Sequence, residues 1–66
     1  MADKDLQGRE VIFEMQKIGG FVRVSAMDTA TMTEVVMQAP VTASEAVLKS
    51  NALKKLEYVL KKKGLI

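Results

Sequence analysis

A pair of glycines, Gly19 and Gly20, lies between two runs of alternating residues and limits the possible folds of this chain more than any other feature. In residues 10–17, Val11, Phe13 and Met15 alternate with Ile12, Glu14 and Gln16, a period of two that is typical of a β-strand. After the glycines, Val22, Val24 and Ala26 alternate with Arg23 and Ser25. A two-residue turn of type I′ requires positive φ at both central positions, and glycine adopts it without steric cost. The sequence therefore predicts an antiparallel hairpin.

The glycine turn also fixes the register of this hairpin, and the side-chain pattern tests that register, because a slip of one residue would put opposite faces together. With Ile18 opposite Phe21, one face gathers the apolar residues Val11, Phe13, Met15, Val22, Val24 and Ala26. The other face gathers the polar residues Glu14, Gln16, Arg23 and Ser25. The predicted hairpin is therefore self-consistent.

A third strand is predicted after a short loop. Residues 28–33 are rich in Asp and Thr, whose side chains stabilise turns, and residues 33–39 alternate again. Met32 stands near the end of the loop, where positive φ and therefore glycine are preferred, so we expect either mild strain or a different loop geometry there. Pro40 ends the strand, because it has no N–H to give to the ladder.

The C-terminal part of the chain is predicted to form one amphipathic helix over about residues 43–63. Thr42 and Glu45 match a capping box, with Ser44 as a rival cap, and Gly64 stands where a left-handed residue often ends a helix. At 100° per residue, the apolar side chains fall within an arc of about 160°. These are Ala46, Leu48, Ala52, Leu53, Leu56, Val59 and Leu60.

The predicted fold is α+β in two layers: a three-stranded antiparallel β-meander (about 10–18, 21–28 and 33–39) packed on one C-terminal helix (about 43–63). A length of 66 residues leaves room for a single domain, 1–66, in which we expect residues 1–8 to form a flexible N-terminal segment. A chain this short buries only about 60% of the surface of its unfolded form, so association with another chain would add useful stability.

Several kinds of chemistry have no residues to support them. The sequence has no Cys and no His, so we expect no metal site and no cofactor. The glycine pair lies in a hairpin and not at a strand-to-helix turn, so it does not predict a phosphate loop. Candidate acid–base groups are expected to be scattered over the surface of a domain too thin for a deep pocket, and we predict that the chain is not an enzyme. These groups are Glu10, Glu14, Asp28, Glu34, Glu45, Glu57 and Tyr58.

The first residues and the hydropathy pattern bear on location. The charged start, residues 1–5, has no apolar run behind it, and no stretch approaches the roughly 18 apolar residues of a membrane span. We therefore predict a cytoplasmic protein without membrane contact.

Four segments carry a resemblance to known proteins. They are Asp5-Leu6-Gln7-Gly8-Arg9-Glu10-Val11, then Gly19-Gly20 with Val22-Arg23-Val24-Ser25-Ala26, then Thr33-Glu34-Val35, then Ala52-Leu53-Lys54-Lys55-Leu56 with Tyr58-Val59-Leu60. With them the chain resembles a small family of uncharacterised bacterial proteins of about 60–70 residues. The resemblance implies a bacterial cytosolic protein and no assigned activity, and relatives have Gly where this chain has Met32.

The sheet face away from the helix is the predicted interaction surface. It mixes apolar and polar side chains, as protein interfaces do, and the two outer strands have no proline inside them to block pairing. We predict a small non-enzymatic interaction or regulatory module, either a homodimer that forms through this face or an edge strand, or a subunit that binds an unknown protein partner. The candidate interface residues are Ile12, Phe21, Arg23, Met27 and Val36.

The alternative is a nucleic-acid-binding module. Residues 43–63 contain six lysines and two glutamates, for a net charge of +4. Lysines on the solvent side of a helix can contact phosphates, and an aromatic residue among them can stack on a base. The candidate contacts are Lys54, Lys55, Tyr58, Lys61 and Lys62.

Overall fold

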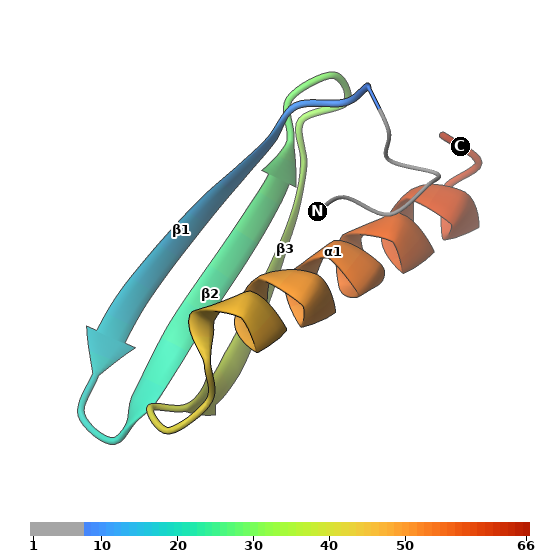
Figure 1. Cartoon of the computed structure of the whole chain (residues 1–66). Coiled ribbons are helices and arrows are strands. Elements are labelled where there is room, and N and C mark those ends of the chain that lie inside the picture. Colours follow the sequence, from blue (N-terminus) through green and yellow to red (C-terminus); the bar gives the residue numbers. More distant parts are fainter. Residues whose placement is uncertain (1–7) are drawn as a thin grey trace.

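A computed structural model describes residues 8–66 and contains one open sheet and one helix (Figure 1). Its elements are β1 (Val11–Ile18), β2 (Phe21–Asp28), β3 (Thr33–Pro40) and α1 (Glu45–Lys62). The strands are antiparallel in the order β1-β2-β3, so the predicted fold class is confirmed. Residues 1–7 of the expected N-terminal segment lie outside the described residues.

The β1–β2 hairpin has the predicted register, with Ile18 opposite Phe21 and Val11 opposite Asp28. The expected turn type is wrong, because only Gly19 has a positive φ, 59°, and Gly20 does not. Positive φ at the first central position alone is the pattern of a II′ turn. Both primed turns have two residues and match the strand twist, so the register is the same with either.

The β2–β3 connection also follows the predicted register, with Asp28 opposite Thr33. Met32 has a φ of 58°, and among residues 8–66 it is the single non-glycine residue with positive φ. The positive φ expected near the end of this loop is therefore confirmed, and a Cβ in this conformation lies close to the following carbonyl. Strand β3 includes Pro40, one residue beyond the prediction.

Helix α1 begins two residues later than predicted. Ser44 is the N-cap, and its Oγ accepts a hydrogen bond from the Val47 N–H at 3.2 Å, so the Thr42 capping box is wrong and the rival cap is right. At the other end Gly64 has a φ of 75°. Leu65 N–H donates to the Leu60 carbonyl at 2.8 Å, and Gly64 N–H donates to the Lys61 carbonyl at 3.0 Å, which together form a Schellman motif.

The core lies between α1 and the strands β2 and β3, on which the helix packs (Figure 1). Five of the seven apolar helix residues predicted to face the sheet are buried, and Val59 is half-buried. Ala46 is exposed, because it lies at the margin of the apolar arc in the first turn of the helix. The buried apolar residues are Val24, Ala26, Val35, Leu48, Ala52, Leu53, Leu56 and Leu60.

Candidate functional site

The outer sheet face, which points away from α1, carries all five candidate interface residues. The register places Ile12 beside Met27, and it places Phe21 beside Ile18 at the opposite end of the sheet. Ile12 is 49% exposed, Ile18 40% and Phe21 37%, whereas Met27 and Val36 are half-buried. Arg23, between these apolar ends, is exposed. The structure therefore puts the five residues on one face but does not gather their apolar side chains into one patch.

Ser25 at the centre of the outer face is buried, which the alternating pattern did not predict. The register places Glu14 on one side of Ser25 and Val36 on the other. Cross-strand neighbours on one face have Cβ atoms only about 5 Å apart, so longer side chains can screen a small one between them. The small size of Ser25 beside larger neighbours was the signal in the sequence that could have predicted its burial.

The free edge of β1 presents backbone groups of its odd-numbered residues. In an antiparallel ladder, hydrogen-bonded pairs alternate with non-hydrogen-bonded pairs. The Thr29 N–H donates to the Glu10 carbonyl at 3.2 Å, which makes even-numbered residues of β1 the ones bonded to β2. The N–H and C=O groups of Val11, Phe13, Met15 and Lys17 therefore point away from the sheet.

The free edge of β3 is partly occupied. The Val41 N–H donates to the Gly20 carbonyl at 3.4 Å, which makes odd-numbered residues of β3 the ones bonded to β2. The backbone groups of Val36 therefore point outward. Lys55 Nζ donates to the Val36 carbonyl at 2.8 Å. Pro40 lies on the same edge and has no N–H to offer. A lysine and a proline are two devices that protect sheet edges from pairing.

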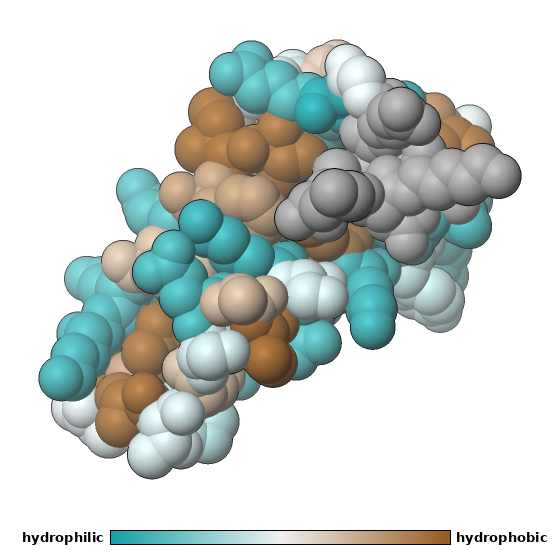
Figure 2. All heavy atoms as spheres, viewed as in Figure 1, coloured by the Kyte–Doolittle hydropathy of each residue, from teal (hydrophilic) through white to brown (hydrophobic). Residues whose placement is uncertain are grey.

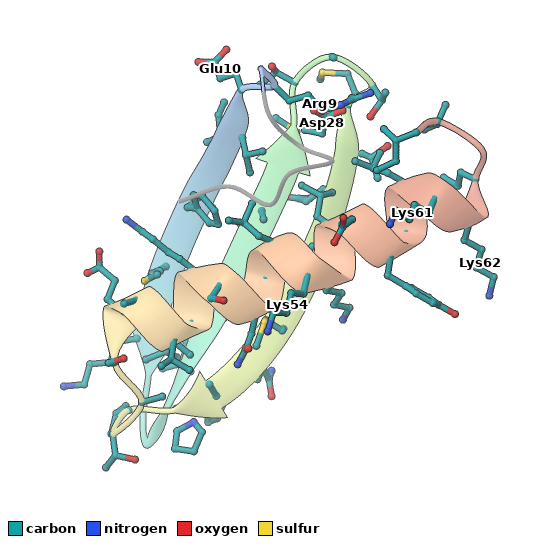
Figure 3. All side chains as sticks on the ribbon, turned by 45° about the vertical axis from the view of Figure 1, so that its right-hand side comes forward. Arg9, Glu10, Asp28, Lys54, Lys61 and Lys62 are labelled. Carbon is teal, nitrogen blue, oxygen red and sulfur yellow. The ribbon has the colours of Figure 1, made fainter. Side chains whose placement is uncertain are left out.

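A buried charged cluster lies at the end of the sheet where β1 begins (Figure 3). Arg9 Nη1 lies 2.8 Å from Asp28 Oδ2, which also accepts from Thr31 Oγ1 at 2.7 Å and from the Thr31 N–H at 3.2 Å. The Asp28 side chain is 0% exposed, and within the described residues its Oδ1 has no hydrogen-bond partner.

The expected surface position of Asp28 is therefore wrong, because the register directs its side chain to the inner face next to the helix. Arg9 Nη2 also donates to the Leu65 carbonyl at 3.4 Å, so the cluster joins the two ends of the described chain. These bonds hold the loop and both ends in place, and the carboxylate has no access to solvent. The sequence contained an Arg and an Asp but no local signal that they pair.

The helix residues predicted to bind nucleic acid lie along α1, with Lys54 near its middle and Lys61 and Lys62 near its C-terminal end (Figure 3). Tyr58 is 64% exposed, and Lys62 Nζ lies 5.9 Å from the centre of its ring. Lys61 Nζ lies 3.5 Å from Glu57 Oε2. Lys55 points to β3 through its bond to Val36. The structure therefore gives Lys55 and Lys61 intramolecular partners.

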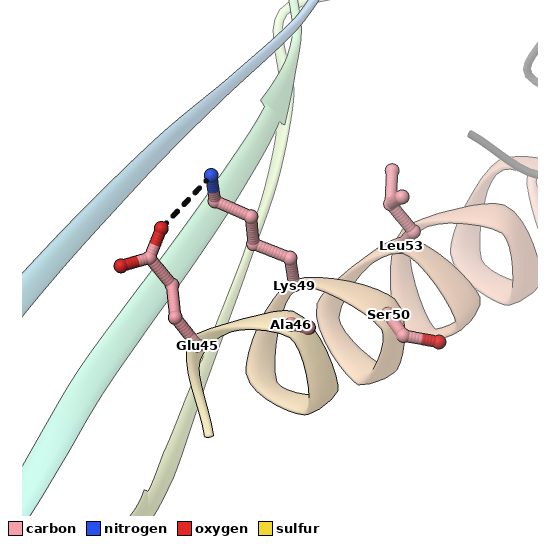
Figure 4. Close-up of a pocket in the computed structure, with 5 residues that line it drawn as sticks. All are labelled: Glu45, Ala46, Lys49, Ser50 and Leu53. Carbon is pink, nitrogen blue, oxygen red and sulfur yellow. Dashed lines mark ion pairs between the residues drawn. The ribbon is translucent and has the colours of Figure 1, made fainter. Parts of the chain in front are cut away.

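A shallow depression of about 290 Å³ lies along the first turns of α1 (Figure 4). Its lining residues all come from that helix: Glu45, Ala46, Lys49, Ser50 and Leu53. Glu45 Oε2 and Lys49 Nζ form an ion pair at 3.2 Å, so its two charged groups face each other. Among residues 8–66, no three His, Cys, Asp or Glu side chains lie close enough together to hold a metal ion.

The fold and these surfaces define a small α+β domain with one covered and one open sheet face. Residues 8–63 match the profile of a domain of unknown function, DUF6898, and the chain belongs to this family. No curated protein is significantly similar to it, and no solved structure is either. Within residues 8–66, no helix is long and apolar enough to cross a bilayer.

Proposed function

We propose that this chain is a small non-enzymatic protein-interaction module that associates with a second copy of itself through its sheet. The observation that carries the proposal is the incomplete cover of the sheet by α1. The helix packs on β2 and β3, no residue of β1 is buried, and the outer face exposes Ile12 and Phe21. Interfaces enrich such aromatic and aliphatic residues among polar neighbours.

Sedimentation equilibrium over a range of protein concentrations tests the proposal. Self-association predicts a mass that rises from 7.3 kDa toward twice that value. A monomer at millimolar concentration would contradict it. Phe21→Asp distinguishes association through the outer face from association through a strand edge, because it places a charge on the outer face and leaves the strand edges unchanged. Val47→Asp, at a helix residue that is 51% exposed, is the matched control for the added charge.

Nucleic-acid binding is the second candidate, and the exposed Tyr58 ring with Lys54 and Lys62 on the same helix favours it. An exposed aromatic ring among cations can stack on a base while the cations contact phosphates. Fluorescence anisotropy with labelled single-stranded DNA and RNA at low salt is the test. Binding that weakens steeply with salt supports this function, and Tyr58→Ala with Lys54→Ala should abolish it. No binding at low salt contradicts it.

We also propose that the protein acts in the bacterial cytoplasm. The support is compositional, because a chain without Cys suits a reducing compartment, and it rests further on the resemblance to bacterial proteins. Fractionation of the native cell with an antibody against the chain tests this location.

A further inference from the structure

We propose that two copies of this chain join through their β1 edges in antiparallel orientation, about a two-fold axis at Met15, to form one continuous six-stranded sheet. The inference rests on the self-association proposed above and deepens it by naming the surface and the register. It is carried by the free backbone groups of β1, by the incomplete cover of this strand, and by its charge pattern.

Within residues 8–66, the outer edge of strand β1 is unprotected. The backbone N–H and C=O groups of Val11, Phe13, Met15 and Lys17 point outward, and within the described residues they have no backbone partner from outside the sheet. The strand contains no proline and spans Val11–Ile18 without a bulge in its register with β2. Such an edge is a template for pairing with another strand.

The side chains of β1 are also covered less than those of its neighbours. No residue of β1 is buried, whereas β2 and β3 both contribute buried residues to the core. Figure 2, which shows the helix side of the molecule, has apolar surface beside the helix along the β1 side. A strand from a second copy would lie next to the half-buried side chains of Phe13 and Met15 and shield their exposed flanks.

The opposite edge makes an open-ended assembly unfavourable. Strand β3 is occupied at the Val36 carbonyl by Lys55 and includes Pro40, so it is a poor partner for β1 of another copy. Pairing of β1 with β1 uses the same edge on both copies and closes after two, as in other two-fold interfaces. The asymmetry between the edges therefore points to a dimer.

The charges on β1 select the register. A two-fold axis at Glu14 would put this carboxylate opposite its own copy, in a non-hydrogen-bonded pair with the Cα atoms only about 4.5 Å apart. A two-fold axis at Phe13 would put Lys17 opposite Arg9, which lies outside β1 and is bound to Asp28, so only residues 11–15 would pair strand to strand. An axis at Met15 avoids the like-charge pair and overlaps residues 12–18 fully. It pairs Ile12 with Ile18, Phe13 with Lys17, and Glu14 with Gln16.

The Glu14–Gln16 pair provides the test. Gln16→Glu places two like-charged pairs across the seam and should weaken the dimer about tenfold, whereas Gln16→Lys places two opposite-charged pairs there and should tighten it about tenfold. Gln38→Glu and Gln38→Lys are matched controls. Gln16 and Gln38 both flank Arg23 on the exposed outer face, but Gln38 belongs to the far edge strand.

Dissociation constants from sedimentation equilibrium at low salt, and amide hydrogen exchange at two protein concentrations, are the measurements. We expect the dissociation constant to rise in Gln16→Glu, to fall in Gln16→Lys and to stay unchanged in both Gln38 variants. The dimer should also persist in Phe21→Asp. It also expects exchange at Phe13, Met15 and Lys17 to slow as the concentration rises, while Glu34 and Gln38 on the β3 edge stay unchanged.

Two results would overturn this inference in distinguishable ways. If the Gln16 and Gln38 variants change the dissociation constant equally, or if Phe21→Asp abolishes the dimer, the association takes place through the outer face. The proposed self-association would then still hold. A monomeric chain at every concentration would overturn both.

Discussion

At the scale of single residues, Met32 is the position where side chain and backbone disagree. Its φ of 58° lies in the left-handed region, and its side chain is 70% exposed, so it gains little from packing. Met32→Gly should raise the free energy of unfolding by about 0.5 kcal/mol, because the relief of strain exceeds the added entropy of the unfolded chain.

Urea unfolding measures the effect of Met32→Gly. Ala30→Gly is the matched control, because Ala30 lies in the same exposed loop and does not have positive φ. The control should lower stability by about 0.5–1 kcal/mol. If both variants lose stability equally, the left-handed backbone at Met32 costs nothing.

The Arg9–Asp28 pair is the second feature at this scale. The Asp28 side chain is fully buried and the Arg9 side chain is 23% exposed, so removal of the arginine would leave a buried carboxylate without its partner. Arg9→Met leaves a buried charge with Thr31 as its remaining hydrogen-bond donor and should cost about 3 kcal/mol.

Thermal and urea unfolding with circular dichroism test this cost. Arg9→Lys keeps the positive charge and should lose less, which keeps the comparison measurable if Arg9→Met does not fold. Lys54→Met on the exposed helix surface should change stability by less than about 0.5 kcal/mol. A loss from Arg9→Met no larger than that of Lys54→Met would contradict a structural role for the pair.

At the scale of elements, the start of α1 distinguishes two serine/threonine caps that the sequence alone left open. Ser44 Oγ accepts from the Val47 N–H, and Ser44 has the extended backbone of an N-cap, with φ −72° and ψ 151°. Ser44→Ala should therefore cost about 1 kcal/mol, whereas Thr42→Ala should cost less than about 0.5 kcal/mol. Helix content and the urea midpoint measure the loss of stability in each variant. A larger loss in Thr42→Ala than in Ser44→Ala would identify Thr42 as the cap.

At the scale of the whole molecule, the thin core bears on the proposed association. One helix packs on β2 and β3, and β1 contributes only half-buried or exposed side chains. If two copies associate, the urea midpoint should rise with protein concentration, by up to about 2.7 kcal/mol of apparent stability for a hundredfold excess over the dissociation constant. A midpoint independent of concentration would show that folding does not depend on a second copy.

The elements of this fold could be predicted from the sequence because their signals are local. Gly19 and Gly20 fix the hairpin, the alternation of β3 fixes its inward face, and Gly64 ends the helix. The predicted turn type and the predicted Thr42 cap were wrong, because similar residues are compatible with two turn types and with two cap positions. Turns of type I′ and II′ differ in the backbone angles of their two central residues, and a cap at Thr42 differs from one at Ser44 in which residue has an extended backbone. The residue pattern does not determine these angles.

The candidate surface could be predicted in part. The five interface residues lie on the outer face as expected, because strand alternation assigns faces directly. The burial of Ser25 was not predicted, although its small size beside larger neighbours was a signal in the sequence. The edge bond from Lys55 to Val36 could not be predicted, because it depends on where the helix crosses the sheet.

By itself, the sequence determined the order of the elements, the register of the sheet and the face on which each strand residue lies, since periodicity and turn residues act over short distances. Only the tertiary structure decided where α1 lies across the sheet. That placement buries Asp28 with Arg9, puts Lys55 on the edge of β3 and leaves β1 least covered. The physical reason is that these contacts join residues far apart in the chain, and the packing of a helix on a sheet decides which of them meet.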